Sequence, residues 1–302
     1  GYIVRNRDCR LVFDPVSGEL SSWKASGISL IQEPPAFNVW RAPTDNDGWY
    51  RNAEDTSKFL GQWLEAGLKE LRSDQPYLGV ALTGAHVVRF SAQGRIESAN
   101  KKLGFDVHTD YFVYGDGSIR LHMDVNCDPG LPVLPRLGLK MVLPAGFENV
   151  TYYGRGPVEN YLDRNCGSAL GRYETTLDEM YVPYIWPQEF GNRTDVRWAA
   201  LTNDEGAGLL AVAGGPLEFS AHHYTLDNLD QAEHTCDLQR VDETYLYLDY
   251  MQTGVGSRSC GHNTLEPYRL QPGRYVHRVL LRPIRPGQDP AELARQRIPE
   301  QP

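Results

Sequence analysis

Alternating apolar and polar residues run through most of the chain and predict β-strands. From Ile119 to Val125 every second residue is apolar, which is the pattern of an antiparallel strand with one buried face. A similar run precedes it at residues 105–112, and Gly115-Asp-Gly117 between the two is a hairpin signal. Residues 11–20 predict a strand, a glycine turn and a second strand. Further strands are predicted at residues 137–143, 196–201, 208–213, 217–221, 245–249 and 275–281.

One segment has helical periodicity instead. Between Thr56 and Arg72, apolar residues recur at helical spacing, namely Phe59, Leu60, Trp63, Leu64, Leu68 and Leu71. Asp55 or Thr56 can cap the start of this helix, and Gly67 weakens it. Shorter helical turns are expected at residues 225–232 and 289–297.

Many strands with one main helix near residues 56–72 predict an all-β fold, a large antiparallel sandwich. The 302 residues are enough for a sizeable core. We expect a single domain over residues 1–302, with a loosely ordered tail over 284–302.

Charge and cysteine content narrow the class of protein. A net charge of −9 disfavours nucleic acid, which requires concentrated Lys and Arg, and no apolar run approaches a membrane span. The five cysteines are dispersed, without CxxC or zinc spacing, so we expect buried free thiols, no metal site and a cytoplasmic location. The start at Gly1, without Met or a signal-peptide core, suggests a chain trimmed from a longer protein.

The segment 152–164, Tyr-Tyr-Gly-Arg-Gly-Pro-Val-Glu-Asn-Tyr-Leu-Asp-Arg, has the composition of an ordered loop at a site or interface. Its charged side chains can pair with one another or bind a polar ligand. The candidates are Arg155, Glu159, Tyr161, Asp163 and Arg164.

A second aromatic and charged loop spans residues 181–198. Trp186 and Trp198 could stack on a sugar, and the neighbouring polar residues could bind its hydroxyls. The alternative is a loop that holds two sheets together. The polar candidates are Gln188, Glu189, Asn192 and Arg193.

Two further polar groups admit more than one interpretation. Asp45 and Asp47 could bind a cation, or Arg41 could pair with one of them in an Asx-rich turn. His222 and His223 are expected to face opposite ways on a strand, one buried and one exposed. Glycoside hydrolysis would need two carboxylates across a sugar, and sequence spacing cannot establish such a pair. The available carboxylates are Glu159, Asp163, Glu174, Asp178 and Glu189.

Four motifs in order resemble the C-terminal domain, or separate small chain, of β-galactosidases of glycoside hydrolase family two. They are residues 37–47 (Phe-Asn-Val-Trp-Arg-Ala-Pro-Thr-Asp-Asn-Asp), 154–164, 180–189 and 254–260. The resemblance implies a galactose-mutarotase-like supersandwich. It also implies that the catalytic glutamates of a retaining galactosidase lie on a separate (β/α)8 barrel, so this chain alone should be inactive and carry no catalytic residue.

The resemblance further implies a role for the loop at residues 254–263. In some family members a tryptophan after the Gly-Val-Gly motif forms part of the sugar platform, and here Cys260 is its best match. A thiol cannot stack as an indole does, but Cys260, His262 and Arg258 are candidates for lining the substrate pocket. The implied partners are the barrel domain or large subunit and the galactoside substrates, and the intact enzyme is expected to be oligomeric. No cofactor is expected in this chain, and any Mg or Na ions of the enzyme are expected on other domains.

Two alternatives remain open. An autonomous carbohydrate-binding module would use Trp186, Trp198, Tyr153 and Tyr161 for stacking. An aldose 1-epimerase, which shares the fold, would need a histidine acid and a glutamate base, and the candidates are His108, His122, His222 and Glu266.

Overall fold

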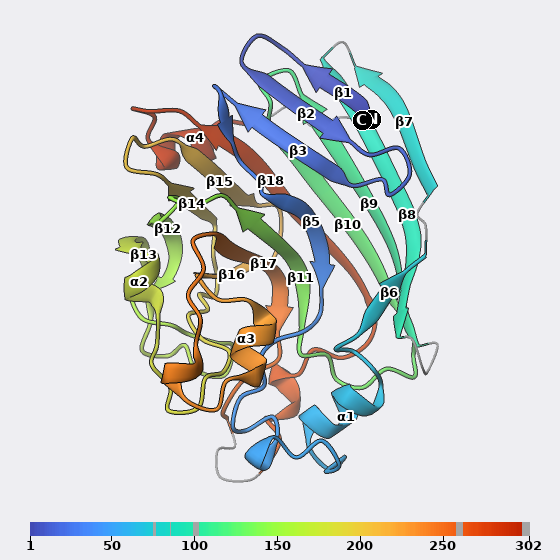
Figure 1. Ribbon diagram of the computed structural model, residues 1–302, viewed down its shortest axis with the longest axis vertical. Coiled ribbons are helices and arrows are strands. Elements are labelled where there is room, and N and C mark those ends of the chain that lie inside the picture. The colour runs from blue at the N-terminus through green and yellow to red at the C-terminus, as the bar shows by residue number, and fades with distance from the viewer. Residues whose placement is uncertain (75–76, 85, 99–102, 258–261, 298–302) are drawn as a thin grey trace.

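Antiparallel sheets make up most of the computed structural model, which describes residues 1–74, 77–84, 86–98, 103–257 and 262–297 (Figure 1). The largest sheet has ten strands. Nine of them follow the order β13 (Ala169–Thr176), β12 (Asn149–Gly156), β14 (Trp198–Thr202), β15 (Gly208–Ala213), β18 (Arg274–Ile284), β10 (Ile119–Cys127), β9 (Gly104–Tyr114), β8 (Val87–Ser98) and β6 (Leu71–Ser73), and β7 (Tyr77–Gly84) also pairs with β8.

Two four-stranded sheets accompany the large one. One has the order β16 (Glu218–His222), β17 (Thr244–Gln252), β11 (Arg136–Leu143) and β5 (Glu33–Asn38). The other is formed by the N-terminal strands β1 (Tyr2–Arg5), β2 (Cys9–Phe13), β3 (Leu20–Ala25) and β4 (Ile28–Ser29). The predicted all-β antiparallel sandwich is therefore confirmed.

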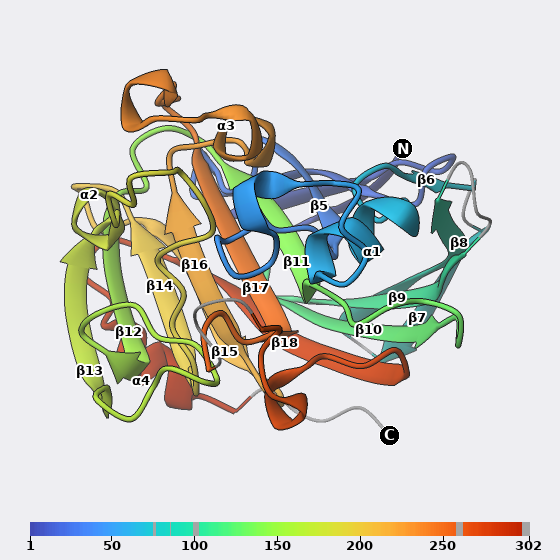
Figure 2. The ribbon, with the colours of Figure 1, turned by 90° about the horizontal axis from the view of Figure 1, so that it is seen from below.

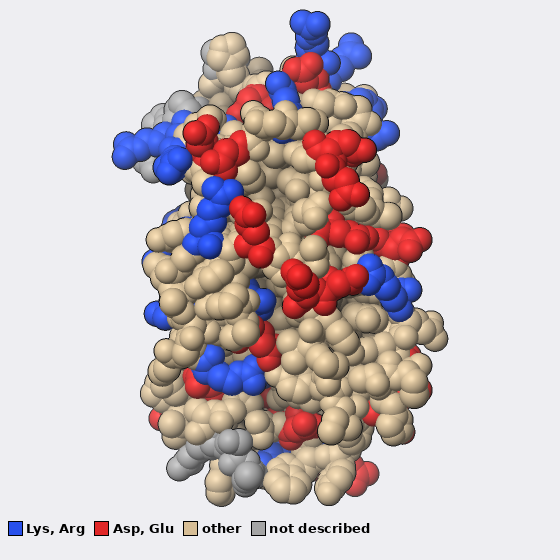
Figure 3. Space-filling model, turned by 90° about the vertical axis from the view of Figure 1, so that its left-hand side faces the viewer, with Lys and Arg blue, Asp and Glu red and all other residues tan. Residues whose placement is uncertain are grey.

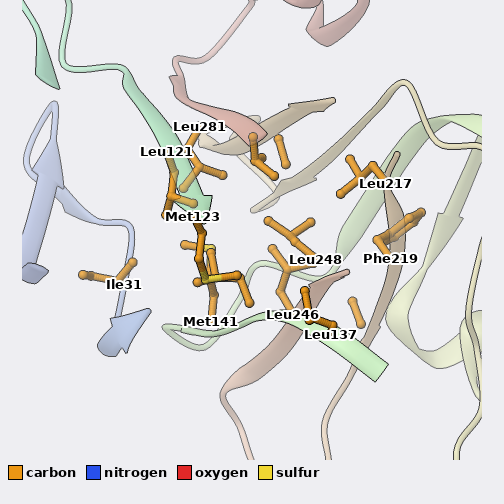
Figure 4. Packing of buried hydrophobic residues seen from close by; sticks show 14 of the residues in the cluster. Ile31, Leu121, Met123, Leu137, Met141, Leu217, Phe219, Leu246, Leu248 and Leu281 are labelled. Atoms are coloured by element: carbon orange, nitrogen blue, oxygen red, sulfur yellow. The ribbon is translucent and has the colours of Figure 1, made fainter. Parts of the chain in front are cut away.

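The core lies between the large sheet and the sheet of β11 and β17. Figure 4 shows Leu121 and Met123 of β10 facing Met141 of β11 and Leu248 of β17. Alternate residues of β10 are buried, as the period of two in the sequence predicts. Each such side chain contributes about 1.5–3 kcal/mol on burial, so this interface holds the two sheets together.

The main helix is shorter than predicted. Helix α1 covers Phe59–Glu65 and buries Phe59, Leu60 and Trp63. Gly67 then adopts a left-handed conformation with φ of 73°, which interrupts the helical pattern, and residues 71–73 form strand β6 instead. Periodicity identified the helix, but the glycine ended it.

The other helices are single turns or little more. They are α2 (Leu177–Met180), α3 (Leu226–Gln231), α4 (Pro290–Arg295), and the 3-10 turns η1 (Trp49–Arg51), η2 (Thr235–Asp237) and η3 (Glu266–Tyr268). Both short helices predicted from the sequence exist. Helix α4 falls within the tail expected to be loosely ordered, and its Leu293 is buried against Trp198 and Leu210.

Several local expectations are wrong. Strand β12 continues to Gly156, so the first residues of the predicted 152–164 loop belong to a sheet. His222 and His223 are both buried, because the strand ends at His222 and the Nδ1 of His223 lies 3.0 Å from the carbonyl oxygen of Glu243. The four cysteines in the described ranges are free, and of these Cys9 and Cys127 are buried, whereas Cys166 and Cys236 are exposed.

Candidate functional site

The sequence motifs converge at one end of the sandwich, which we call the loop end (Figure 2). Asn46 Nδ2 donates to the carbonyl oxygen of Val255 at 2.7 Å. The backbone nitrogen of Glu189 donates to the carbonyl oxygen of Ala42 at 3.0 Å. These bonds connect segments more than a hundred residues apart. The loop end comprises η1, α1, α3 and residues 40–48, 157–168, 181–193, 253–257 and 262–269.

Asp163 organises the loop that begins at residue 254. Its carboxylate accepts backbone N–H bonds from Val255 at 3.0 Å and from Gly256 and Ser257 at 2.8 Å each. The hydroxyl of Thr264 donates to it as well, at 2.8 Å. Four donors on one carboxylate fix both ends of this loop, since charge-assisted hydrogen bonds are the strong ones.

The close approach of Asp163 requires a glycine at residue 254. A Cβ atom on Gly254 would lie 2.5 Å from Cγ of Asp163, which is closer than packing allows. Burial by itself raises the pKa of Asp163, but the hydrogen bonds from Gly256, Thr264 and Val255 outweigh it and leave the pKa below its usual value. The carboxylate is therefore a permanent anion that braces the loop.

A second carboxylate, Glu159, joins two of the predicted loops. It accepts hydrogen bonds from Arg164 and the Tyr184 hydroxyl through Oε1, and from the Gly191 backbone through Oε2 at 2.8 Å. Its side chain is only 10% exposed. Glu159 thus ties the 157–168 segment to the 181–193 segment.

An open hollow lies beside these two carboxylates. It has a volume of about 570 Å³. Its lining consists of Val158, Glu159, Asp163, Arg164, Asn165, Cys166, Gly167 and Ser168. Because Glu159 and Asp163 already accept several bonds from the chain itself, the hollow presents polar walls of fixed geometry.

A buried ionic network supports the loop end from beneath. Arg136 of β11 is fully buried and donates to Asp249 of β17 and, at 3.0 Å, to Glu189. Its guanidinium lies 4.5 Å from the ring centroid of Tyr247. The other carboxylate oxygen of Glu189 accepts from Gln252 at 3.2 Å. Losing one member of such a network leaves a buried charge unpaired, at a cost of about 3–5 kcal/mol.

Glu218 extends this network in a protonated state. It is the cross-strand partner of Asp249 and accepts a bond from Asn192 at 2.9 Å. Burial, followed by the negative charge of Asp249, raises the pKa of Glu218 to about 8. The hydrogen bond from Asn192 acts in the opposite direction but is weaker than burial. Burial also raises the pKa of Asp249 to about 6, with Arg136 opposing.

Arg193 shows that the 181–198 loop connects sheets. Its backbone nitrogen donates to the carbonyl oxygen of Phe219 on β16 at 2.8 Å. Its Nε donates to the hydroxyl of Tyr152 on β12 at 3.0 Å. Because β16 and β12 belong to different sheets, the interpretation of a loop that holds two sheets together is confirmed.

The aromatic candidates are only partly available. Trp198 and Tyr161 are buried, with 8% and 2% exposure, so neither can stack on a sugar. Trp186 is half-buried beneath Arg51, whose guanidinium lies 4.9 Å from its ring centroid. Only Tyr153 presents much of its surface, and an autonomous sugar-binding platform loses two of its four predicted members.

The remaining candidates have structural partners. Arg155 donates to Asp195 and to the carbonyl oxygen of Ser168. Arg41 is buried and pairs with Asp47, which also accepts from the backbone nitrogen of Thr44, as the Asx-turn interpretation of residues 40–48 expects. Among the described residues, no group of three or more His, Cys, Asp or Glu side chains could hold a metal ion.

Of the three pocket-lining candidates, one lies within the described residues. Arg258 and Cys260 fall outside the described residues, whereas His262 is exposed. The histidines considered for an epimerase do not all lie together: His108 and His122 are on the paired strands β9 and β10 of the large sheet, whereas His222 is on β16 of a smaller sheet. Burial lowers the pKa of His222 to about 3, which leaves it neutral.

Sequence reasoning named Glu189 but missed Arg136, Asp249 and Glu218 of the ionic network. Arg136 immediately precedes the apolar run 137–143, and Asp249 ends the predicted strand 245–249. A charge inside or beside an apolar strand is a signal of a buried pair. The identity of the partners could not follow from it, because β11 and β17 are far apart in the chain.

Comparisons with known proteins agree with the fold. The family profile described as "Beta galactosidase small chain" matches residues 5–281. The β-galactosidase of Vibrio cholerae serotype O1 is 33% identical over 276 residues, covering 89% of this chain and 26% of the relative. That of Actinobacillus pleuropneumoniae is 31% identical over 272 residues, covering 90% and 26%. The chain thus spans about a quarter of the length of these curated relatives.

Among solved structures, a galactose 1-epimerase from Lactobacillus acidophilus NCFM shares the fold. It superposes with a TM-score of 0.51 at 8% sequence identity and covers 93% of each chain. At that identity the similarity concerns the fold alone. No helix in the described part of the chain is long and apolar enough to cross a membrane.

Proposed function

This chain belongs to the β-galactosidase small-chain family, and we propose that it completes the active site of a β-galactosidase whose catalytic glutamates lie on another domain or subunit. The family resemblance predicted from four motifs is thereby confirmed. The proposed reaction is hydrolysis of terminal β-D-galactosides with retention, through a glutamate nucleophile and a glutamate acid/base on the barrel.

The arrangement of Asp163 is the observation that carries this proposal. A carboxylate with four donors, three of them successive backbone nitrogens, serves to hold residues 254–257 in one conformation. A rigid loop is what a substrate-pocket wall requires, because misplacement by 1 Å can cost about a hundredfold in rate. The loop, with Arg258, Cys260 and His262, would line the galactoside pocket and exclude water.

The carboxylates at the loop end suit a supporting role. Asp163, Glu159 and Glu189 each accept hydrogen bonds from the chain itself. A nucleophile or acid/base pair must instead face a sugar across a gap of about 5–9.5 Å. We therefore propose that bond cleavage takes place on the partner and that this chain alone is inactive.

Assays of the separate and combined polypeptides test the division of labour. Purified chain should give no turnover of nitrophenyl β-galactoside, and addition of the barrel-bearing polypeptide of the same enzyme should restore it. Turnover by the chain alone, retained after repeated purification, would refute the proposal. Calorimetry with galactose and lactose should detect no millimolar binding by the chain alone, whereas a binding module would show it.

Replacing Asp163 tests the role of the loop. In the assembled enzyme, Asp163→Asn removes the charge that holds residues 255–257 and should raise the KM for nitrophenyl β-galactoside by roughly tenfold, the equivalent of about 1.4 kcal/mol. Asp14→Asn is the matched control, because Asp14 accepts backbone bonds from Val16 and Ser17 in the β2–β3 turn. Equal KM values for the two variants would count against a pocket-wall role.

We also propose a reducing compartment, the cytoplasm, for the enzyme. The four described cysteines are free, and two of them are exposed, which suits a reducing environment. The intact enzyme is proposed to be oligomeric.

A further inference from the structure

A cleft where the three sheets meet takes no part in the proposed function. It has a volume of about 270 Å³, and its walls come from the turn between β2 and β3, from β5 and β11, and from β6, β8, β9 and β10 of the large sheet. In Figure 1 the N-terminal strands and β5 lie in front of β8, β9 and β10. None of the described residues that line the cleft belongs to the loop end, so the cleft is a separate feature of the fold.

Small residues on the inner face of β8 open the cleft. Along this face Phe90 is buried and stacks on Phe13 with ring centroids 3.8 Å apart. The next two residues of the same face are Ala92 and Gly94. Because alanine carries only a methyl group and glycine no side chain, the space between the sheets is not filled at this point, and both residues line the cleft.

Apolar side chains form most of the walls. Phe37 of β5, Leu71 of β6 and Ile96 of β8 pack against the core but are only half-buried. Met123 of β10 and Leu139 of β11 also line the cleft and are buried. Ligand pockets in proteins are predominantly apolar, with a small number of well-placed polar groups. The cleft thus offers apolar surface that a bound molecule can cover.

Two buried residues with hydroxyl groups line the cleft. Thr109 and Tyr111 occupy successive inward-facing positions of β9 and are 9% and 6% exposed. Within the described part of the chain, neither hydroxyl forms a hydrogen bond. Buried polar groups are usually hydrogen-bonded, because removal from water without a partner is unfavourable. The two hydroxyls are therefore placed to bond a molecule in the cleft.

The charge at the cleft is negative. Glu19 lines it and is exposed. Burial and, after it, the negative charge of Glu19 raise the pKa of Tyr111, so Tyr111 keeps its proton and can donate. The described lining contains no Lys, Arg or His, in contrast to the side formed by β13 and α2, where Figure 3 shows many charged side chains. An anionic ligand would therefore meet a like charge and no cationic partner.

Size and polarity define the class of ligand. A protein cavity of about 150 Å³ holds benzene, so a volume of about 270 Å³ accommodates one ring with a short substituent. Galactose carries more hydroxyls than Thr109 and Tyr111 can pair, and the others would be removed from water beside apolar walls. A single hydroxyl on a ring matches the two side chains, because it can donate to one and accept from the other.

We propose that the cleft binds an uncharged alcohol with a single apolar ring, through hydrogen bonds to Thr109 and Tyr111. The ring packs against the apolar walls. Tyr111 donates to the hydroxyl of the ligand, which in turn donates to Oγ1 of Thr109. The inference goes beyond the proposed function and does not depend on it, because the cleft shares no described lining residue with the hollow beside Asp163.

Ligand-observed NMR titration of the chain with benzyl alcohol tests the proposal. The dissociation constant should be about one millimolar, as expected for a ligand of this size. Thr109→Val and Tyr111→Phe each remove one hydroxyl with little change in volume, and each should weaken binding by about three- to tenfold. The matched control is Tyr114→Phe, which should bind as the unaltered chain does. Tyr114 is also on β9 and its buried hydroxyl has no partner among the described residues, but it does not line the cleft.

Two competitors test the class of ligand. Benzoate has the same ring with a negative charge, and it should bind at least about fivefold more weakly than benzyl alcohol. Glu19→Gln should reduce that difference. Galactose should not displace benzyl alcohol.

Each contrary result overturns a definite part of the proposal. Equal affinity of Thr109→Val, Tyr111→Phe and Tyr114→Phe, or no binding at about twenty times the expected constant, would show that the cleft is not the site. Benzoate that binds as tightly, or displacement by galactose, would show that the class of ligand is wrong. Binding to this chain but not to the assembled enzyme would show that another part of the enzyme covers the cleft. Unaltered circular dichroism melting verifies the folding of each variant.

Discussion

Buried ionisable residues on β16 and β18 have shifted pKa values, each with a clear cause. Glu218 lies beside Asp249 in a site that water does not reach, so its neutral form is favoured. His277 and His222 are buried and neutral, and burial lowers their pKa values to about 4 and about 3. These groups link the protonation state of the network to the stability of the fold.

Glu218 should make stability fall as pH rises above neutrality. The folded state keeps its proton up to a pKa of about 8, whereas the ordinary value is 4.5, so folding binds a proton in that interval. Below about pH 6.5, proton uptake by unfolded His222 and His277 opposes this effect. Between about pH 7 and 8 the Glu218 contribution is the larger of the two, and the decline stays below about 1.4 kcal/mol per pH unit.

Urea unfolding of Glu218→Gln across this pH range checks the sign. The amide is neutral at every pH, so the variant should lose the decline seen in the unaltered chain between about pH 7 and 8. A parallel decline in both proteins would show that Glu218 is ionised in the folded state. Glu174→Gln, an exposed residue on β13, is the control and should leave the slope unchanged.

At the scale of elements, the sequence correctly predicts strands whose apolar residues alternate with a period of two. The prediction fails for strands that are formed by packing or by pairing with a neighbour. Strand β10 alternates buried residues with half-buried or exposed ones along its length, and its prediction is confirmed. Strand β5 contains Pro34 and Pro35, residues that disfavour strands, and was not predicted. Edge strand β13 buries no residue, so it offers no apolar alternation to detect.

The same reasoning applies to the site. Glycine, proline and charge content identified the residues that converge at the loop end, including Asp163 and Glu159. Their partners could not be predicted, because a backbone nitrogen such as that of Gly256 leaves no signal in composition. The bonds also join positions about ninety residues apart, such as Asp163 and Gly256, and only the strand order brings these together.

Helix α4 should be an integral part of the fold although it is short. Leu293 is 6% exposed and packs on β14 and β15, and Arg282 donates to its carbonyl oxygen at 2.8 Å. Leu293→Ala should lower the free energy of unfolding by about 2–3 kcal/mol, by loss of apolar contact and creation of a cavity. Urea denaturation of this variant and of Glu292→Ala, an exposed neighbour, provides the comparison. Equal stabilities would show that α4 is not docked.

On the scale of the whole molecule, one apolar cluster connects all three sheets. It includes Phe13 and Trp23 of the N-terminal sheet, Leu121 of the large sheet and Leu248 of the remaining one. Phe13 stacks on Phe90 of β8 with ring centroids 3.8 Å apart. The N-terminal sheet therefore shares its core with the rest of the chain, which favours the single domain expected from the sequence.

This shared core predicts one cooperative unfolding transition. If the N-terminal sheet cannot unfold without exposing the side chains of the large sheet, calorimetry should show one peak whose calorimetric and van 't Hoff enthalpies agree. At about 0.7 kcal/mol per residue near 60 °C, the enthalpy should be roughly 200 kcal/mol. Phe13→Ala should shift the whole peak to lower temperature, because the stacked pair lies within the common core. Two separate peaks, only one of which moves in this variant, would mean that the N-terminal sheet is an independent unit and that residues 1–302 form more than one domain.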